Sequence, residues 1–219
     1  MLMLDNICYR YKSGDSDVLK NITANFIAGK FYSIVGPSGV GKTTLLSIMA
    51  GLDRPTSGKV LINDNELTTI DLNQYRSQSI SMVFQSFHLF PLLTALENTS
   101  YLMETSGVKR KDAEARAKEL LNIVGISEDK HNRYPSNLSG GEQQRVAIAR
   151  SLSTGARVIL ADEPTGNLDT MNSSAIVKLL QNLAHDENYC VIIVTHNPEI
   201  ANISDVVYLM SDGCISPSK

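Results

Sequence analysis

The segment with the clearest chemical potential is a glycine-rich run that directly follows an apolar stretch. It reads Gly36-Pro37-Ser38-Gly39-Val40-Gly41-Lys42-Thr43-Thr44. Its first eight residues fit the pattern G-x-x-x-x-G-K-[ST], in which glycines let backbone N–H groups turn toward phosphate oxygens. Lys42 is expected to neutralise the β- and γ-phosphates of a nucleotide, and the Thr43 hydroxyl to bind Mg²⁺. A plain glycine turn has no need of Lys-Thr at its end, so the segment predicts a phosphate-binding loop.

Two adjacent carboxylates form the second chemical group. Asp162 and Glu163 directly follow the apolar residues 158–161, which read as a buried strand. Ligands bind beyond the carboxyl ends of strands in parallel sheets, so both side chains are expected beside the phosphates. Asp162 is predicted to hold Mg²⁺, and Glu163 to polarise the attacking water as a general base. A solvated acidic turn would explain the pair if it stood alone, but the upstream phosphate loop favours the catalytic interpretation.

A third segment, Leu138-Ser139-Gly140-Gly141-Glu142, predicts the start of a helix. Ser139 and Glu142 have the spacing of a capping box, in which each side chain bonds the other residue's backbone N–H. Gly140 and Gly141 then fall in the first turn, where each costs about 1 kcal/mol relative to alanine. The stability of the helix does not call for them. They are consistent with a helix N-terminus that approaches another object closely, such as a phosphate.

The elements that position these groups are read from apolar periodicity. Residues 31–35 form an apolar strand that ends at the glycine-rich run, and residues 43–50 a helix that ends at Gly51. Residues 109–124 show apolar side chains at helical spacing. Further strands are expected within residues 1–35, 58–83, 158–161, 191–195 and 206–210, and a further helix over about 172–184. Strands that alternate with helices and are almost continuously apolar predict an α/β fold around a buried, mostly parallel sheet.

Composition narrows the classes of function. The chain has 219 residues, 42% of them hydrophobic, and a formal net charge of −3, which argues against a general nucleic-acid binder. Cys8, Cys190 and Cys214 lie far apart in sequence and predict neither a zinc site nor a disulfide framework, and Cys190 is expected in the core. No apolar run is long enough to span a bilayer, and the residues after Met1 turn polar too early for a signal peptide. Membrane contact is therefore expected only through a partner or lipid.

Taken together, the three segments resemble the motifs of ABC ATPases, in which Leu-Ser-Gly-Gly-Glu is the signature between a phosphate loop and an Asp-Glu pair. The similarity covers essentially the whole chain. It implies a P-loop NTPase core with a mostly parallel sheet, an N-terminal antiparallel β-subdomain and a helical subdomain insertion. The single domain 1–219 would divide into the core with its β-subdomain, about 1–86 and 156–219, and the helical subdomain, about 87–155.

The resemblance assigns two further catalytic residues. Gln85 matches the Q-loop, which senses Mg²⁺ and contacts the membrane partner, and His196 matches the switch histidine that contacts the γ-phosphate. Without the motifs, Gln85 would read as a surface amide and His196 as a structural histidine. The other histidines carry no motif and are expected on the surface: His88, His131 and His185.

Two more contacts to ATP follow from the resemblance. Asn167-Leu168-Asp169 matches the D-loop, and Asp169 is expected among the ATP-binding residues, as are the signature residues Ser139 to Glu142. Tyr11 lies where the family places the aromatic residue that stacks on adenine. Tyr9, two residues away, is the alternative for that role.

Three stretches narrow the branch of the family: residues 52–58, 92–98 and 162–169. They resemble the ATPases of macrolide-export, lipoprotein-release and antimicrobial-peptide systems, which are often separate chains. The implied partners are an integral membrane permease and, in some systems, a membrane or periplasmic adaptor, whereas nucleic acid is not among them. The implied location is the cytoplasmic face of the cell membrane. Two alternatives remain open: a soluble ABC ATPase that acts on nucleic acid, and one that regulates a membrane complex without transport.

In this family each ATP lies between the phosphate loop of one subunit and the signature helix of the other. The resemblance therefore implies a head-to-tail homodimer with two ATPs and Mg²⁺ at the interface. Ser139, Gly140 and Gly141 of one subunit would face Lys42 and Glu163 of the other. The opening and closing of this dimer would then drive the permease.

An apolar group follows Gln85 directly and consists of Phe87, Leu89 and Phe90. Packing of the helical insertion onto the sheet explains at least one of these side chains. The others are predicted to line a groove that takes a short cytoplasmic helix of the permease, because such docking needs an exposed apolar surface.

Overall fold

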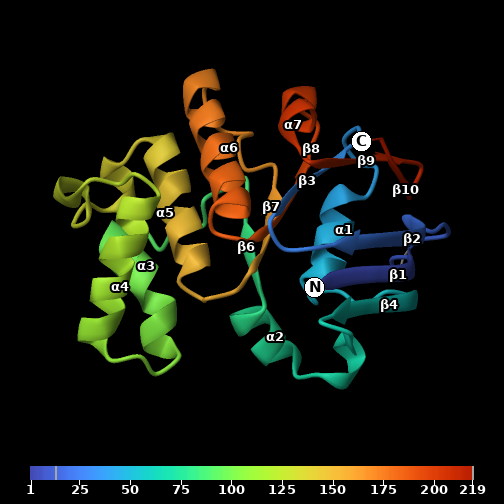
Figure 1. Cartoon of the computed structure of the whole chain (residues 1–219), viewed down its shortest axis with the longest axis horizontal. Helices are drawn as coiled ribbons and strands as arrows, with labels where there is room; N and C mark the ends of the chain where they lie inside the picture. The colour runs from blue at the N-terminus through green and yellow to red at the C-terminus, as the bar shows by residue number, and fades with distance from the viewer. Residues whose placement is uncertain (13, 219) are drawn as a thin grey trace.

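The computed structural model of the chain, which describes residues 1–12 and 14–218, arranges its strands in two sheets. One sheet has the strand order β10-β9-β3-β8-β7-β6 and the other the order β2-β1-β4-β5. Helices lie beside and between them (Figure 1). The predicted α/β fold class is confirmed, with a mostly parallel sheet and a separate antiparallel sheet formed by strands of the N-terminal part.

The larger sheet brings the ends of its central strands to one edge. Across the sheet its strands are β10 (Cys214–Pro217), β9 (Val206–Ser211), β3 (Lys30–Val35), β8 (Cys190–Thr195), β7 (Val158–Asp162) and β6 (Ile80–Val83). The pairs from β9 to β6 are parallel, and β10 returns antiparallel to β9. Val35 pairs with Thr195 and Asp162 with Val194. The phosphate loop, the Asp-Glu pair and His196 therefore leave the sheet at the same edge.

The two faces of the larger sheet bury different cores. Side chains alternate between the faces of a strand, so Leu160 and Ile192 contribute to one core and Ile159 and Ile193 to the other. The first core contains the helix α1 (Lys42–Met49) and the second contains α5 (Gly140–Leu152) and α6 (Thr170–His185). Cys190 is buried in the first core, as predicted.

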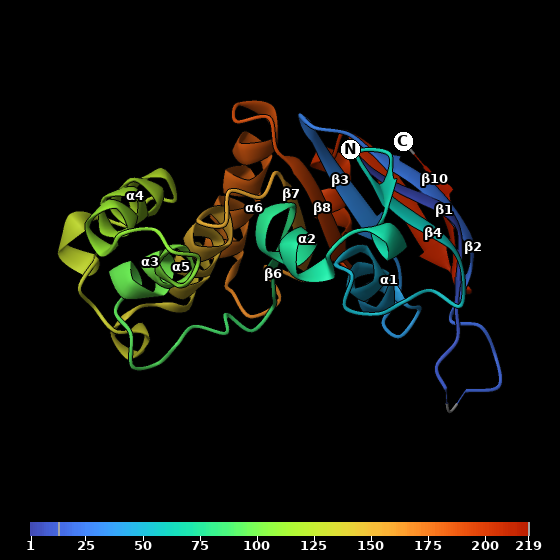
Figure 2. The same cartoon turned by 90° about the horizontal axis from the view of Figure 1, so that it is seen from below.

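The smaller sheet closes over α1. Its strands are β1 (Leu2–Tyr9), β2 (Leu19–Phe26), β4 (Ser57–Ile62) and β5 (Asn65–Glu66), all antiparallel to their neighbours. Figure 2 shows α1 between these strands and β3. The helix is fully buried at Leu45, Leu46, Ile48 and Met49. A helix packed on both sides gives the phosphate loop before it a rigid support.

A group of helices lies at the opposite end of the molecule from the smaller sheet (Figures 1 and 2). It contains α3 (Ala95–Thr105), α4 (Arg110–Ile123) and α5, together with the short helices η2 (Glu128–Lys130) and η3 (Pro135–Asn137). The helix predicted over residues 109–124 is confirmed as α4. It buries the side chains that define its apolar stripe: Ala113, Ala117, Leu120 and Leu121.

The prediction for residues 58–83 was incomplete, because strands alone were expected there. The structure adds η1 (Leu67–Thr69) and α2 (Leu72–Gln78) between β5 and β6. Asp71 caps α2 by accepting from the backbone N–H of Asn73, and Tyr75 is its one buried residue. A seven-residue helix with a single buried side chain has too little apolar periodicity to be seen in the sequence. The helix α7 (Pro198–Ile203) and strand β10 were likewise not predicted.

The surface position predicted for His131 was wrong. The residue is only 4% exposed, and its Nε2 lies 3.0 Å from the backbone oxygen of Ile126. Its own backbone oxygen accepts from the N–H of Leu96 at the start of α3. The segment between α4 and α5 folds back onto α3 here, a tertiary contact without a local sequence pattern. His88 and His185 are exposed, as predicted.

Candidate functional site

The glycine-rich loop presents free backbone donors at the start of α1. Gly41 is the residue before the helix, with a left-handed φ of 109°, and no side chain caps the first turn. The first turn also lacks an acidic residue, so its N–H groups and partial positive charge are directed at an anion. Gly36 is required for a different reason, because a Cβ there would lie 2.4 Å from the backbone oxygen of Met210.

Lys42 and Thr43 lie where the sequence predicted them. Lys42 is 7% exposed, and its Nζ donates to the backbone oxygens of Gly36 at 2.8 Å and Pro37 at 3.0 Å. Its ammonium group therefore stays within its own loop, where phosphate oxygens can replace these backbone acceptors. The Thr43 hydroxyl donates to Asp162 Oδ1 across 3.3 Å. That contact joins the phosphate loop to the end of β7.

The environment of Asp162 suits a carboxylate that binds a cation. Burial raises the pKa of Asp162, and the neighbouring Glu163 charge acts in the same direction. The Thr43 hydrogen bond and the Lys42 charge oppose this shift. A carboxylate that is costly to ionise in isolation gains most from a bound cation, because the cation supplies the missing countercharge.

Glu163 is held in a strained position at the tip of β7. Its φ is 45°, in the left-handed region that residues other than glycine, asparagine and aspartate seldom adopt. One carboxylate oxygen accepts from the Thr195 hydroxyl at 3.0 Å, and the other lies 2.8 Å from His196 Nδ1. The Glu163 side chain is 17% exposed and that of His196 is 64% exposed. The pair thus combines a fixed carboxylate with an imidazole open to the phosphate side.

Gln85 joins the site through Asn167. Gln85 Nε2 donates to Asn167 Oδ1 at 3.3 Å, and Asn167 Nδ2 donates to the Gln85 backbone oxygen at 3.1 Å. A Cβ on Gly166 would lie 2.7 Å from Gln85 Nε2, so a larger residue there would displace the Gln85 amide. Asn167 belongs to the stretch that matches the D-loop, but its contact with Gln85 was not predicted. Thr195 carried no functional signal of its own and was found only through its contact with Glu163.

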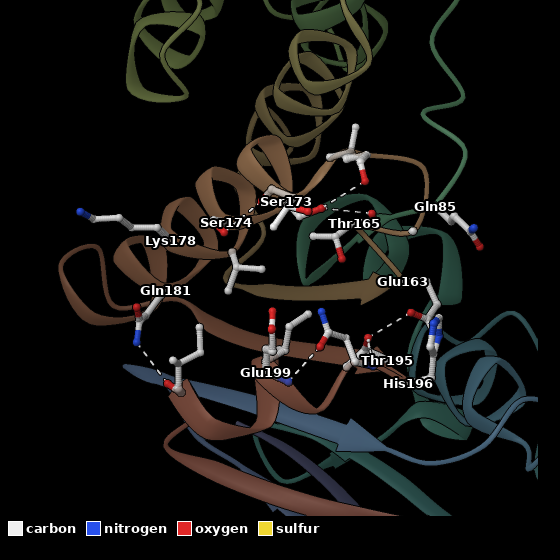
Figure 3. Close-up of a pocket in the computed structure, with 17 residues that line it drawn as sticks. Gln85, Glu163, Thr165, Ser173, Ser174, Lys178, Gln181, Thr195, His196 and Glu199 are labelled. Atoms are coloured by element: carbon white, nitrogen blue, oxygen red, sulfur yellow. Dashed lines mark hydrogen bonds and ion pairs between the residues drawn. The ribbon is translucent and has the colours of Figure 1, made fainter.

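A cavity of about 730 Å³ is lined by Gln85, Glu163, Thr195 and His196, but not by Lys42, Thr43 or Asp162 (Figure 3). Gln85, Glu163 and His196 lie at one end, and Lys178 and Gln181 of α6 at the other. Within residues 1–12 and 14–218, no three side chains of His, Cys, Asp or Glu gather into a metal-binding cluster.

Tyr11 lies beside the phosphate loop. Its hydroxyl is 2.8 Å from that of Thr44, and its side chain is 46% exposed. Tyr9 packs edge-on against it, with ring centroids 5.0 Å apart, and is the more buried of the two. Of the two candidates for the adenine-stacking role, Tyr11 has the open face.

The signature segment begins α5 as predicted. Ser139 is the N-cap, and the capping box with Glu142 is complete in both directions. A Cβ on Gly141 would lie 2.2 Å from Asn172 Oδ1, so this glycine is needed for contact with α6 in the same chain. A close approach of this turn to another object was predicted, and within the chain that object is the Asn172 side chain. Asp169 caps α6 and accepts from the side chain of Asn172 at 2.6 Å, which holds that amide in place.

The signature segment and the phosphate loop do not form one site within the chain. In both views α5 and α1 lie apart, with α6 and the strands β7 and β8 between them (Figures 1 and 2). The chain therefore has two separate groups of site residues. One contains the phosphate loop, the Asp-Glu pair, Gln85 and His196, and the other contains Ser139 and Gly140.

The predicted apolar group after Gln85 is divided by the fold. Leu89 packs against the second core and Phe87 is half-buried next to Gly140, whereas Phe90 is 41% exposed. A separate cavity of about 200 Å³ is lined by residues outside this group, among them Leu52, Arg76, Met82, Leu102 and Arg150. Leu89 is thus a side chain explained by packing, as predicted for at least one of the three. The groove predicted for the others stays a prediction.

Comparisons with known proteins agree with this geometry. The family model described as ABC transporter matches residues 19–166. The chain is 44% identical over 213 residues to an uncharacterised ABC transporter ATP-binding protein of Bacillus subtilis, covering 97% of this chain and 94% of that protein. It is 44% identical to the lipoprotein-releasing system ATP-binding protein of Cytophaga hutchinsonii, covering 92% and 93% of the two chains.

A solved structure extends the agreement to three dimensions. The dimeric post-hydrolysis state of the ATP-binding cassette MJ0796, bound to ADP and Pi, superposes with a TM-score of 0.89 at 38% identity and covers 100% of this chain and 98% of its own. Among the described residues no helix is long and apolar enough to cross a bilayer. The chain therefore belongs to the ABC transporter family, as an ATP-binding and ATP-hydrolysing subunit.

Proposed function

We propose that two copies of this chain close around two ATP molecules and drive a separate membrane permease. The main observation behind this proposal is that the signature segment and the phosphate loop lie apart within one chain (Figures 1 and 2). A second subunit in head-to-tail orientation supplies the missing half of each site. The dimer of the related cassette, described above, supports this arrangement.

Each subunit contributes the phosphate loop, and its partner the signature helix. Lys42 and the N–H groups before α1 bind the β- and γ-phosphates, and Tyr11 stacks on the adenine. Ser139 and Gly140 at the N-terminus of the partner's α5 bind the γ-phosphate from the other side. The capping box leaves the Ser139 hydroxyl in only a long contact, 3.3 Å from the Glu142 N–H, so it can turn to a ligand.

The residues present fit Mg²⁺. Thr43 Oγ1, Asp162 and the Gln85 amide supply the hard oxygen donors that this ion prefers, and Thr43 and Asp162 are already in contact. When bound, Mg²⁺ neutralises charge on the β- and γ-phosphate oxygens. Asp162 is fixed in place by the pairing of β7 with β8, and the Gln85 side chain is fixed by its hydrogen bond to Asn167.

Hydrolysis depends on Glu163 and His196. Glu163 accepts a proton from the attacking water, and its strained backbone and two hydrogen bonds fix the carboxylate toward the γ-phosphate. His196 keeps this carboxylate oriented and donates to the γ-phosphate. Loss of the γ-phosphate removes the contacts that bridge the subunits, so the dimer opens.

The permease docks at the groove between α2 and α5. Leu52 is 55% exposed at its rim, and Leu102 and Met82 line it. Arg150 also lines it and donates to the backbone oxygens of His88 at 2.6 Å and Phe87 at 3.1 Å, directly after Gln85. Movement of an occupant is thus passed to the ATP site. We assign the helical part, about 87–155, to this coupling, and place the subunit at the cytoplasmic face of the membrane.

The relatives favour export or extraction as the work performed, with a drug, peptide or lipoprotein as the class of substrate. The permease chooses that substrate. An adaptor on the far side of the membrane would be a partner of the permease rather than of this chain.

The test of the ATP sandwich is Glu163→Gln. The variant should bind ATP but lose turnover by about 10²- to 10⁴-fold, as expected when a general base is removed. ATP should then shift it to a stable dimer in gel filtration. Glu199 lines the same cavity, and Glu199→Gln is the matched control, which should keep turnover. Near-normal turnover of Glu163→Gln, or a monomer at saturating ATP, would contradict the proposal.

A further inference from the structure

The carboxylate of Glu142 is fully occupied by two neighbours. Its Oε1 accepts from Lys130 Nζ at 2.7 Å, and its Oε2 accepts from the backbone N–H of Ser139 at 2.8 Å. The side chains of Lys130 and Glu142 are 31% and 14% exposed, so the pair is better shielded from water than the other Lys or Arg pairs with carboxylates that the described residues form. Lys130 ends η2, twelve positions before Glu142, and the two meet only because the chain folds back.

This carboxylate stands in an unfavourable place for the proposed function. Glu142 lies in the first turn of α5, whose N-terminus would meet the γ-phosphate bound by the other subunit. A helix N-terminus attracts anions through its free N–H groups and partial positive charge. A carboxylate in the same turn is negatively charged like the phosphate, so it repels the phosphate and offsets that attraction.

Protonation does not remove the charge of Glu142. The Lys130 hydrogen bond is the largest of the causes that lower the pKa of Glu142 to about 2, followed among the favourable ones by the bonds from Ser139. The group is thus a carboxylate at any physiological pH. Lys130 is the cation that touches it.

We propose that Lys130 is a positioning residue for the ATP site completed in the other subunit. Its ammonium group balances Glu142 and holds that carboxylate on the Ser139 N–H, so that the start of α5 offers Ser139 and Gly140 to the γ-phosphate without a net negative charge beside them. The inference rests on the proposed ATP sandwich.

A purely structural role for Lys130 makes a different prediction. If the ion pair only fastens η2 to α5, Glu142→Gln and Lys130→Met both break it and should impair dimer formation to a similar extent. If Lys130 serves to balance the charge of Glu142, only Lys130→Met leaves that charge unbalanced, so Glu142→Gln should keep dimer formation. The comparison of the two single variants and the double variant therefore separates the two roles.

The experiment uses the full chain in the Glu163→Gln background, where ATP traps the dimer. Lys130→Met, Glu142→Gln and the double variant are titrated with ATP, and dimer formation is followed by light scattering. Lys130→Met should raise the ATP concentration that gives half-maximal dimer formation about tenfold. This is the effect expected when one charge-assisted contact is lost. Adding Lys130→Met to Glu142→Gln should change it by less than about twofold.

Three controls keep the result specific. Calorimetry on monomers at low protein concentration should give an unchanged ATP affinity for Lys130→Met, because the phosphate loop is untouched. Arg133→Met breaks the exposed ion pair with Asp129 in the same segment and should leave dimer formation unchanged. Lys130→Arg keeps the charge and should keep dimer formation, which also tests the inference if Lys130→Met does not fold.

The outcomes separate this inference from the proposal on which it rests. If Glu163→Gln itself forms no dimer with ATP, the ATP sandwich fails. If that dimer forms and Lys130→Met is unaffected, or if the double variant is as impaired as Lys130→Met alone, the role of Lys130 is overturned while the sandwich stands.

Discussion

Gln85 and Asn167 form two reciprocal hydrogen bonds that join the segment after β6 to the segment after β7. The contact links the proposed Mg²⁺ and permease sensor to the D-loop, which leads through Asp169 into α6. The Asn172 amide donates to Asp169 and packs closely against Gly141 of the signature helix. Three motifs that are distant in sequence are thus in physical contact within one subunit.

We predict that Asn167→Ala lowers ATP turnover about tenfold and changes ATP affinity by less than about twofold. The substitution removes both hydrogen bonds of Gln85 to this side chain, and a positioning contact of this kind contributes about 1–2 kcal/mol. Steady-state turnover and calorimetric ATP binding are the measurements. Asn122→Ala, at an exposed position of α4, is the control. Unchanged turnover would mean that Gln85 is held by other contacts.

We predict that Gly141→Ala destabilises the fold by about 1–3 kcal/mol, the usual range for overpacking. The new Cβ would lie 2.2 Å from Asn172 Oδ1, and Asp169 prevents the amide from moving away freely. Asn172→Ala should restore part of this loss, because the remaining Cβ lies at 3.1 Å. Gly140→Ala is the matched control for stability, since its nearest neighbour is at 3.4 Å. Urea unfolding measures all four proteins, and an equal loss in both glycine variants would disprove the packing explanation.

The residues that sequence reasoning found share one property: they are contiguous. The phosphate loop, the Asp-Glu pair and the capping box of Ser139 and Glu142 each bring their chemistry together within a few residues. Gln85 and His196 needed the family resemblance, because a single Gln or His carries no pattern. Asn167, by contrast, acquires its place only when the ends of β6 and β7 meet, which the sequence does not encode locally.

The same reasoning explains the errors. His131 was expected on the surface, yet the fold-back onto α3 buries it. Helix α2 depends on one cap at Asp71 and one buried residue, Tyr75, rather than on an apolar stripe. Elements with sustained periodicity, such as α4, were predicted to within a residue at each end.

We predict a specific acid sensitivity from Glu142. Its pKa is about 2 in the folded chain and near the ordinary value of 4.5 in the unfolded chain. The stabilisation is therefore complete above pH 4.5 and is lost as the pH falls toward 2, because only the unfolded chain takes up the proton. Between about pH 4 and 3 the wild-type chain should lose roughly 1 kcal/mol more than Glu142→Gln. Urea unfolding at these pH values tests this, and parallel curves for the two proteins would contradict it.

The last prediction concerns the groove proposed for the permease. Leu52 lies at its rim, 55% exposed, and Arg150 connects its floor to the backbone after Gln85. Phe90 stands beside it, 5.1 Å from the ring of Tyr101 and 5.7 Å from the Arg150 guanidinium. A carboxylate at position 52 would have to lose its water when an apolar helix docks, which is costly without a partner charge.

Leu52→Glu should therefore abolish co-purification of the chain with its permease from native membranes, while ATP binding and basal turnover stay within about twofold of the wild type. Phe90→Glu should weaken docking as well, and it can also displace Arg150 by forming an ion pair with it. Leu209→Glu is the matched control, because this leucine is 47% exposed on β9 in the other part of the molecule. The permease is identified by mass spectrometry of the wild-type complex. If Leu52→Glu co-purifies normally and is stimulated normally by the permease, the docking site lies elsewhere. If Leu209→Glu loses the permease to the same extent, the effect is one of added charge and not of the groove.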